Sequence, residues 1–562
     1  MNAWHQPPGM TGDSALLRVT SVMARRGDRD CAARVAAKAR PGVWPRVRSA
    51  QAPAARPEFG FGPFMTALDL IEHRDLAEEA AVAQAAACRE RGNLPAHPGL
   101  MEWTRPAVAR YLAAAPAMAC LPDGRTLQPA SRAWVYQWNA RDSGEVYEIT
   151  AWGRRYRSRD GAARELRLPR LGTAGDRERS AAEVAVAAYV VAHGHPADPP
   201  ERWSEQHRML RDDDRVERVR VVEYGCADAS VLVLFDGTPA EAEAAFQAVG
   251  KPVLGEVVGD ERTHPGESCA DCKLITICDT LPRVPGLLGI TGTGQPLRTW
   301  SMTNGRNYVV CPARDHLRRL HLPRRDEYDE RARRGMAVHA KIEELHSRLP
   351  HVPCSADDLL ADLAEWQGER WRLGSEQAEV GARQLAQHLL VCPLATRAVA
   401  GQQSGDVRPE RTFAVHDTLA NVIVLAKPDL LYQDRGAWVW RETKTDQGIH
   451  ARETDVMRLY PQAALAVLLL ASGVLGGQQA RSRVEVEVLH PDWPDVLLAD
   501  PHDPSTVARA REVICGHAAQ WHGDLLLDPR PGPWCGRCEV AQWCPARPAL
   551  LTNSAEGERP AA

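Results

Sequence analysis

Residues 427–445 read KPDLLYQDRGAWVWRETKT, and this stretch decides the fold. It predicts two antiparallel strands joined at a turn over residues 434–436. Such a hairpin brings Asp429 of the first strand close to Glu442 of the second. Side chains alternate along a strand, so Glu442 and Lys444 point to the same side of the sheet. The stretch therefore predicts two carboxylates and an amine gathered at one place.

Carboxylate oxygens in this arrangement suit Mg²⁺ or Mn²⁺. A bound cation of this kind polarises a scissile phosphate and acidifies a bound water. Lys444 would orient that water or stabilise the developing negative charge. Acidic and basic residues at strand ends are also ordinary surface charges, so the pattern needs support from the rest of the chain.

Two further motifs flank the hairpin in the chain. Gly335 and His339 form a G-x-x-x-H pattern on a predicted helix before it, and Gln462 lies on a predicted helix after it. In this order, the motifs resemble the PD-(D/E)XK nuclease superfamily, in particular its RecB-like and Cas4-like branch. The resemblance implies an α/β fold with a restriction-endonuclease-like core, an α+β mixed sheet flanked by helices. It also implies hydrolysis of DNA with Mg²⁺ or Mn²⁺.

The resemblance implies a role for each motif residue. His339, Asp429 and Glu442 would bind the metal ion. Asp429, Glu442, Lys444 and Gln462 would form the catalytic set. In that set, Lys444 would activate the water, and Gln462 would orient either the DNA or the lysine.

Several nearby residues are weaker candidates. Glu410 is a possible additional carboxylate, and Glu343 and His346 share the helical face of His339. In the RecB-like branch a tyrosine commonly follows the glutamine by four residues. Here Tyr460 precedes Gln462 instead, which relocates the aromatic ring or weakens the helix assignment.

The cysteines form the second half of the resemblance. Cys535, Cys538 and Cys544 make a C-x2-C-x5-C triad near the C-terminus, and Cys311 lies upstream of the nuclease helix. Four thiolates suit a [4Fe–4S] cluster or a tetrahedral zinc ion. A single CxxC with outlying cysteines, together with the resemblance, favours iron–sulfur, and zinc is the alternative. The cluster would be structural, because phosphodiester hydrolysis transfers no electrons.

The triad occurs twice in the chain. Cys269, Cys272 and Cys278 stand in the same P-G-x-x-C-x2-C-x5-C frame and could hold a second cluster. This repetition suggests an internal duplication. The fourth thiolate of this second group stays open among three cysteines: Cys88, Cys120 and Cys226.

The segments that precede the two triads also run in parallel, as strand, helix, two strands and helix. In this alignment residues 148–150 fall where residues 442–444 stand, so Thr150 replaces the amine. The chain is therefore expected to have two nuclease-like lobes, with the N-terminal one a degenerate copy. The expected parts are a disordered tail or a start placed too far upstream at 1–64, a degenerate domain at 65–282, a linker at 283–300, the nuclease domain with its clasp at 301–548, and a disordered tail at 549–562.

The composition is that of a globular protein and excludes membrane-spanning classes. The chain has 562 residues, of which 44% are hydrophobic and 25% charged. No apolar run is long enough to cross a bilayer, so no membrane partner and a cytoplasmic location are expected. The net charge is only -4, so DNA must bind through local grooves. The arginine-rich segment between Cys311 and His339 is either a ridge that binds phosphate groups or a solvated helix surface with internal ion pairs.

The resemblance implies a DNA nuclease, most readily of exonuclease type, and the sequence does not separate it from an endonuclease. Its expected roles are DNA repair, recombination, CRISPR adaptation or defence against phage. No P-loop is present, so any unwinding of DNA requires a partner helicase. The alternative is a catalytically inactive DNA-binding or scaffold protein with iron–sulfur or zinc sites. The intact carboxylate motif in one lobe and its loss in the other favour the nuclease.

Overall fold

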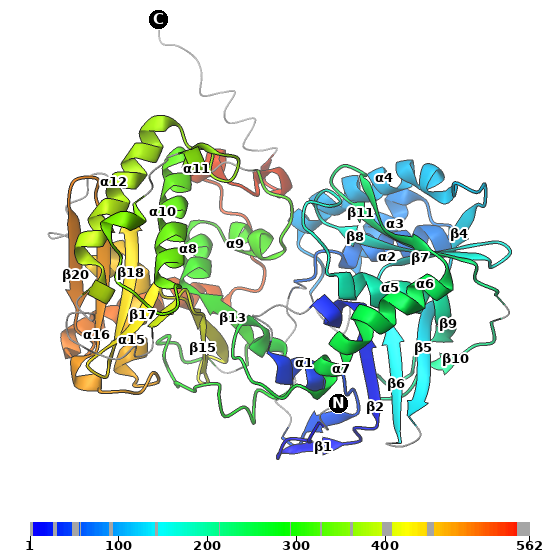
Figure 1. Cartoon of the computed structure of the whole chain (residues 1–562), viewed down its shortest axis with the longest axis horizontal. Coiled ribbons are helices and arrows are strands. Elements are labelled where there is room, and N and C mark those ends of the chain that lie inside the picture. The colour runs from blue at the N-terminus through cyan, green and yellow to red at the C-terminus, as the bar shows by residue number, and fades with distance from the viewer. Residues whose placement is uncertain are drawn as a thin grey trace, which may run out of the picture. The chain divides into compact units, whose positions relative to one another are not determined.

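The structure is a computed structural model. It describes residues 4–25, 31–47, 56, 58–88, 94–140, 144–212, 214–292, 294–325, 329–359, 364–395, 407–446 and 455–547. The described residues form mixed α/β architecture, with sheets flanked by helices (Figure 1), which confirms the predicted fold class. The chain divides into two compact units. Unit 1 contains residues 1–280, 311–325 and 525–562, and unit 2 contains residues 281–310 and 326–524.

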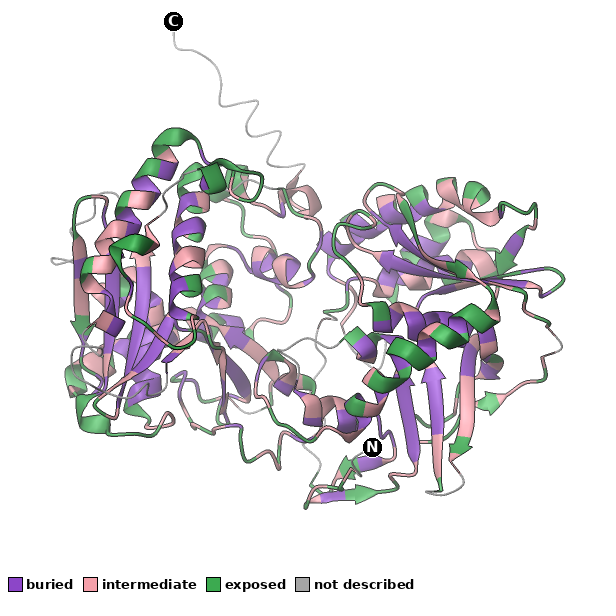
Figure 2. Ribbon diagram, viewed as in Figure 1, coloured by how far each residue is buried: buried purple, intermediate pink, exposed green. Residues whose placement is uncertain are grey.

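The main sheet of unit 2 has five strands in the order β14-β17-β18-β19-β20. The bounds are β14 (Val407–Pro409), β17 (Leu430–Asp434), β18 (Ala437–Thr445), β19 (Arg483–Leu489) and β20 (Pro494–Ala499). Strands β18 and β19 are parallel, and the other neighbours are antiparallel. Strand β18 is buried along most of its length, as Figure 2 shows, which fits its run of apolar residues.

Helices α10 (Glu330–His346), α12 (Ser375–Val391) and α15 (Pro461–Ala471) pack against this sheet. Helix α11 (Ala364–Gln367) packs on α12, and α14 (Val456–Leu459) and α16 (Pro504–Gly523) pack on α15. Val338 of α10 and Leu385 of α12 share one apolar core with Val439 and Leu489 of the sheet. Helix α15 lies in the connection between the parallel strands and is buried over most of its residues. Parallel neighbours need such a crossover segment.

A second sheet of unit 2 has the order β13-β16-β15. The bounds are β13 (Arg298–Ser301), β15 (Phe413–Asp417) and β16 (Val422–Ala426). The expected linker at 283–300 belongs to this region and packs within unit 2. Asp417 accepts hydrogen bonds from the backbone N–H groups of Gly286 (2.8 Å) and Leu288 (2.9 Å). Part of the expected linker is therefore held by hydrogen bonds to β15.

The main sheet of unit 1 repeats the topology of the main sheet of unit 2. Its order is β4-β7-β8-β11-β12, with β4 (Leu127–Pro129), β7 (Arg154–Ser158), β8 (Ala163–Arg170), β11 (Arg218–Gly225) and β12 (Val231–Gly237). Strands β8 and β11 are parallel, and the others pair antiparallel. Helix α5 (Ala181–His193) lies between the parallel strands in sequence, as α15 does in unit 2.

The other large sheet of unit 1 repeats the smaller sheet of unit 2. Strand β2 (Leu16–Thr20) pairs parallel with β6 (Glu145–Thr150), which pairs antiparallel with β5 (Ala133–Ala140). Strands β13, β16 and β15 pair in the same way. Strands β9 (His195–Asp198) and β10 (Arg208–Met209) extend this sheet.

This topology corrects the alignment of residues 148–150 with residues 442–444. Glu148 lies on β6, which corresponds to β16, whereas the strand that corresponds to β18 is β8. Polar and apolar residues follow a similar strand-like pattern in β6 and β18, and such a pattern alone does not show which sheet a strand belongs to.

The expected disorder of residues 1–64 is wrong for much of that segment. Strand β2 lies at the edge of a sheet with Leu17 fully buried, and buried Arg18 pairs with Glu148 at 2.8 Å. Strands β1 (Met10–Gly12) and β3 (Val43–Pro45) pair with each other, and α1 (Ala32–Lys38) follows β2. The many arginines and prolines of this segment concealed its short apolar runs.

The remaining helices are α2 (Gly62–Arg74), α3 (Glu78–Ala87), α4 (Pro98–Ala119), α6 (Pro239–Ala245), α7 (Lys251–Gly259), α8 (Met302–Val310) and α9 (Pro312–Arg319). Phe64 and Trp103 of α2 and α4 share a core with Leu317 and Val540. Both segments that carry the predicted cluster cysteines thus pack into unit 1. None of the described helices combines the length and hydrophobicity needed to cross a bilayer. The expected tail at 549–562 lies outside the described residues.

Candidate active site and metal centres

The β17–β18 hairpin has the predicted form. Asp434 pairs with Ala437, and Arg435 and Gly436 between them both have positive φ, of 50° and 82°. Two positive φ angles in succession characterise the tight type I′ turn, which suits the twist of antiparallel strands. The same register pairs Leu430 with Arg441. Asp429 therefore lies across from Glu442.

The three predicted catalytic groups converge at this position. Lys444 Nζ lies 3.0 Å from Glu442 Oε2 and 3.4 Å from Asp429 Oδ2. The backbone N–H of Thr443 donates to Asp429 Oδ2 at 2.6 Å, which fixes the aspartate against the neighbouring strand. The structure thus brings together two carboxylates and one amine.

Burial and neighbouring charges separate the pKa values of the two carboxylates. Burial raises the pKa of Glu442, and Asp429 adds to this effect, although Lys444 opposes it. Burial would also raise the pKa of Asp429, but Lys444 and His339 outweigh it and keep that pKa below its usual range. Trp440 Nε1 donates to Glu442 Oε1 at 2.9 Å and holds the buried carboxylate in place. A cation bound between them would favour the ionised form of both.

His339 reaches the same place from helix α10. Its Nδ1 lies 3.3 Å from Asp429 Oδ1, and it forms with Asp429 and Glu410 a group whose ligand atoms lie within 4.8 Å of one another. Glu410 also pairs with Lys427, and the negative charge of Glu343 acts on it. Glu410 therefore lies at the site, and Glu343 lies near it.

Gln462 lies on the first turn of α15. Its Oε1 is buried and has no hydrogen-bond partner among the described residues. Tyr460 is close enough to Lys444 and Asp446 for their charges to affect the pKa of its hydroxyl, which burial raises. The aromatic ring expected after the glutamine therefore precedes it and still lies at the site.

The predicted cysteine group near the C-terminus is also assembled. Cys311 is the N-cap of α9, Cys535 lies in a short 3₁₀ turn over Pro533–Arg537, and Cys538 directly follows that turn. Cys544 directly follows a second 3₁₀ turn over Ala541–Trp543. These four residues line one cavity together with Trp534 and Val540. Backbone N–H groups of Arg530 and Gly532 donate to the sulfurs of Cys311 and Cys535, both at 3.3 Å. Such N–H···S bonds stabilise thiolates that bind a metal.

The second cysteine group has a different fourth member from those expected. Burial raises the pKa of Cys269 and Cys272, that of Cys272 to about 12, and Cys31 adds to both shifts. His264 N–H donates to Cys31 Sγ at 3.4 Å, and Gly266 N–H donates to Cys269 Sγ at 3.3 Å. Cys278 also acts on Cys269. The four cysteines that lie together are Cys31, Cys269, Cys272 and Cys278.

Cys31 was overlooked because its segment was expected to be disordered. Cys226 instead lies in an apolar core, and Cys88 and Cys120 are exposed. A signal was present: Cys31 begins a C-A-A-R segment, and Cys311 begins a C-P-A-R segment. Each cysteine is the N-cap of a short helix.

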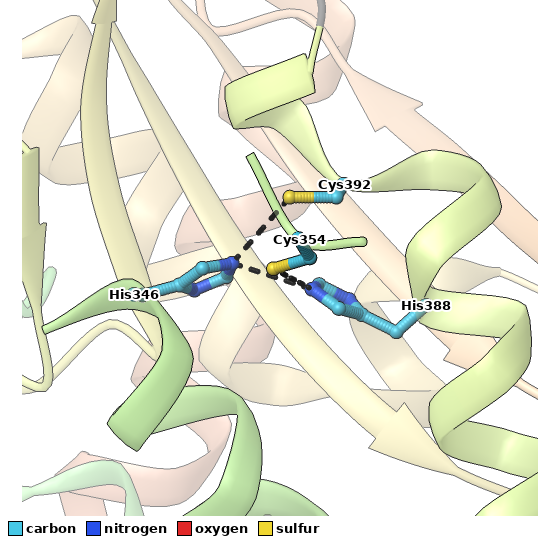
Figure 3. Close-up of side chains that lie close together, drawn as sticks. All are labelled: His346, Cys354, His388 and Cys392. Carbon is cyan, nitrogen blue, oxygen red and sulfur yellow. Dashed lines mark hydrogen bonds between the residues drawn. The ribbon is translucent and has the colours of Figure 1, made fainter. Parts of the chain in front are cut away.

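A third group of metal-binding residues was not predicted as a set. His346, Cys354, His388 and Cys392 are all buried, and their ligand atoms lie within 4.8 Å of one another (Figure 3). His346 therefore does not join His339 at the carboxylates. The available signal was the H-x3-C spacing of His388, on the last turn of α12, and Cys392, which directly follows that helix.

The arginine-rich segment is largely engaged within the protein. Arg314 Nη2 lies 3.0 Å from Glu539 Oε2, and Arg318 also pairs with Glu539. Arg334 is buried and donates to Gln377 Oε1 at 2.6 Å. These three side chains hold protein segments together, so they do not form the expected ridge for phosphate groups.

Residues 299–545 match the family model of the PD-(D/E)XK nuclease superfamily. This region is a PD-(D/E)XK nuclease superfamily domain. The match includes the carboxylate hairpin and all four cysteines of the C-terminal group. Membership implies metal-dependent nuclease activity, a hydrolase function.

Among solved structures, the chain is similar to the crystal structure of SSO0001. The sequence identity is 16% and the TM-score is 0.18, over 38% of this chain and 98% of that one. A TM-score this low carries no argument about the fold. No curated protein matches the chain.

Proposed function

We propose that this protein is an Mg²⁺- or Mn²⁺-dependent deoxyribonuclease of exonuclease type, in the RecB-like and Cas4-like branch. The observation that carries the proposal is the convergence of Asp429, Glu442 and Lys444 beside His339, inside the matched domain. Carboxylate oxygens are the ligands that Mg²⁺ and Mn²⁺ prefer, so the donor set fits these ions.

The residues of the site have separable tasks. Asp429, Glu442 and His339 would hold the cation, which polarises the phosphate and acidifies its water. Burial would lower the pKa of Lys444, but Glu442 and Asp429 outweigh it and raise that pKa. Lys444 would act as a positive charge that orients the water and stabilises charge on the phosphate.

Gln462 supplies a buried acceptor for the substrate or its water. Its Oε1 accepts no hydrogen bond from any described residue. A buried polar atom without a partner lowers the free energy of unfolding. A donor brought by DNA, or by a water that Lys444 orients, would satisfy it. Gln462 would then contribute to positioning.

We further propose that both cysteine groups hold [4Fe–4S] clusters. In the described residues, the groups whose ligand atoms lie within 4.8 Å include neither cysteine group. Four sulfurs on one zinc ion lie only about 3.8 Å apart, whereas each cysteine of a cubane binds a different iron. The wider spacing supports iron–sulfur, and zinc remains the alternative. The clusters fasten distant segments of unit 1.

The N-terminal lobe supports the proposal of a degenerate copy. Its β8 carries Glu165 and Arg167, which pair with each other at 2.6 Å in a buried position. Arg154 on β7 pairs with Glu72 and Asp69. Arginines thus engage these acids, which in the described part of this hairpin do not form a carboxylate pair open to a cation. The lobe would keep a cluster without nuclease chemistry.

The test uses full-length protein with end-labelled single- and double-stranded DNA and Mn²⁺. Lys444→Ala should abolish cleavage while the visible absorbance of the clusters is retained. Lys341→Ala is the matched control, because Lys341 pairs with Glu344 at 2.9 Å away from the carboxylates. Covalently closed circular DNA distinguishes the modes, since an exonuclease leaves it intact.

Binding of DNA without cleavage by the wild type, with either metal, would favour the scaffold alternative. The partner helicase, the role in DNA repair and the cytoplasmic location stay predictions.

A further inference from the structure

Four buried metal-binding side chains meet far from the carboxylate hairpin in sequence. His346 is the last residue of α10, and His388 lies on the last turn of α12. Cys392 directly follows α12, and Cys354 lies in the segment after α10. Figure 3 shows the two rings and the two sulfurs pointing toward one centre.

The distances between these atoms match the edges of a tetrahedron around one zinc ion. His346 Nε2 and His388 Nε2 are 3.3 Å apart. Cys354 Sγ lies 3.8 Å from His388 Nε2, and Cys392 Sγ lies 3.8 Å from His346 Nε2. Tetrahedral zinc holds nitrogen at about 2.0–2.1 Å and sulfur at about 2.3 Å, so its N–N edge is about 3.3 Å and its N–S edge about 3.6 Å.

The carboxylate of Glu487 orients His388 by contacting the ring nitrogen that faces away from the centre of the group. Glu487 Oε1 lies 2.6 Å from His388 Nδ1, which leaves Nε2 directed at the centre of the group. Such a carboxylate–histidine contact fixes the tautomer of a zinc ligand. Glu487 Oε2 in turn accepts a hydrogen bond from Thr443 Oγ1 at 3.0 Å. Hydrogen bonds through Glu487 of β19 and Thr443 of β18 therefore connect the ligand set to the sheet.

We propose that His346, Cys354, His388 and Cys392 bind one structural Zn²⁺ ion. Two sulfurs and two imidazoles are a donor set typical of structural zinc, and four protein ligands leave no open position for a substrate. The set is fully buried, which also suits a structural ion. The ion would fasten the C-terminal ends of α10 and α12 to each other and, through Glu487, to β19.

Fixing the end of α10 would also affect the carboxylate site. His339 lies seven residues before His346 on α10, so both lie on one face of the helix. Thr443, which Glu487 contacts, stands between Glu442 and Lys444. The zinc ion would thus fix the helix that presents His339 to Asp429. This consequence rests on the proposed nuclease function, whereas the zinc site itself does not.

The experiment measures metal content per chain in untagged full-length protein, washed with EDTA to clear the carboxylate site. Cys392→Ser should contain one zinc ion fewer than the wild type, whatever metal fills the other cysteine groups, and the iron content should not change. Cys515→Ser is the matched control, because Cys515 lies on α16 outside all three groups. It should keep the wild-type zinc content.

A second measurement covers the case in which the variant does not fold. The zinc X-ray absorption spectrum of the wild type should contain imidazole scattering at about 2.0–2.1 Å together with sulfur at about 2.3 Å. Zinc without imidazole ligands, or no zinc at all in protein from zinc-supplied cells, overturns the proposal. So does a Cys354–Cys392 disulfide found by mass spectrometry of the unreduced protein.

Discussion

The two five-stranded sheets share one topology and differ in what their central hairpins carry. In unit 2 the hairpin of β17 and β18 gathers Asp429, Glu442 and Lys444, two acids and one base. In unit 1 the hairpin of β7 and β8 carries Arg154 and Arg167, each paired with buried or half-buried acids. The order of strands is therefore the same in both sheets, although only one hairpin carries the carboxylate group. In each case a C-x2-C-x5-C triad follows the sheet in the sequence.

The largest expected effect is a difference in the rate of DNA cleavage between variants of the two hairpins. Glu442→Gln removes a buried negative charge that would bind the cation, so cleavage of DNA should fall on the order of 10³-fold. Glu165→Gln on β8 should leave the rate per folded molecule unchanged. Initial rates on labelled DNA, normalised to folded protein, check both. Equal losses in the two variants would mean that unit 1 takes part in cleavage.

The next effect compares the two cysteine groups by iron content. Cys31→Ser and Cys311→Ser should each lower the iron content and the visible absorbance to about half, because each removes a ligand of one cluster. Cys226→Ser should leave the iron content unchanged, since Cys226 lies in an apolar core. Iron analysis after anaerobic purification measures this. Unchanged iron in Cys31→Ser would exclude Cys31 as a ligand.

The buried ion pairs of unit 1 should matter for stability alone. Glu165→Gln leaves Arg167 without its partner in a buried position, which should lower the free energy of unfolding of unit 1 by about 3–5 kcal/mol. Glu217→Gln, at an exposed pair with Arg125, should change it little. Urea unfolding followed by circular dichroism measures the difference. Equal destabilisation by the two variants would contradict the assignment of Arg167 as buried and internally neutralised.

The smallest expected effect compares the turns of the two hairpins. Gly161 and Gly436 both have positive φ, of 73° and 82°, so alanine at either costs about 1–2 kcal/mol. At Gly161 an added methyl group would also collide with the carboxylate of Asp214, whereas at Gly436 the nearest atom, of Gln478, lies at 3.5 Å. Thermal unfolding should therefore show a larger loss for Gly161→Ala. A larger loss for Gly436→Ala would show that Asp214 moves aside easily.

Local features of the sequence predicted the geometry of the carboxylate hairpin well. The turn at Arg435–Gly436 and the two-residue step from Glu442 to Lys444 depend only on neighbours in the chain. Register and alternation then determine which side chains meet. The mixed α/β class follows from the same alternation of strands and helices.

Long-range assembly could not be predicted in the same way. The zinc ligands His346 and Cys392 are joined by α12 and by segments whose packing no local pattern specifies. Cys31 and Cys269 lie far apart in the chain, and the arginines and prolines of the N-terminal segment suggested disorder around Cys31. Residues 148–150 look like a β18-type strand until pairing partners are known, because strand patterns carry no information about which sheet they enter.

The packing of Leu317 and Val540 has a practical consequence for work with this protein. Both side chains are buried against Phe64 and Trp103, although they flank cysteines of the matched nuclease region. A clone restricted to residues 299–545 would leave these apolar side chains facing water and invite aggregation. The limits of the family match are therefore not the limits of an independently stable piece, and biochemical work should retain the N-terminal residues.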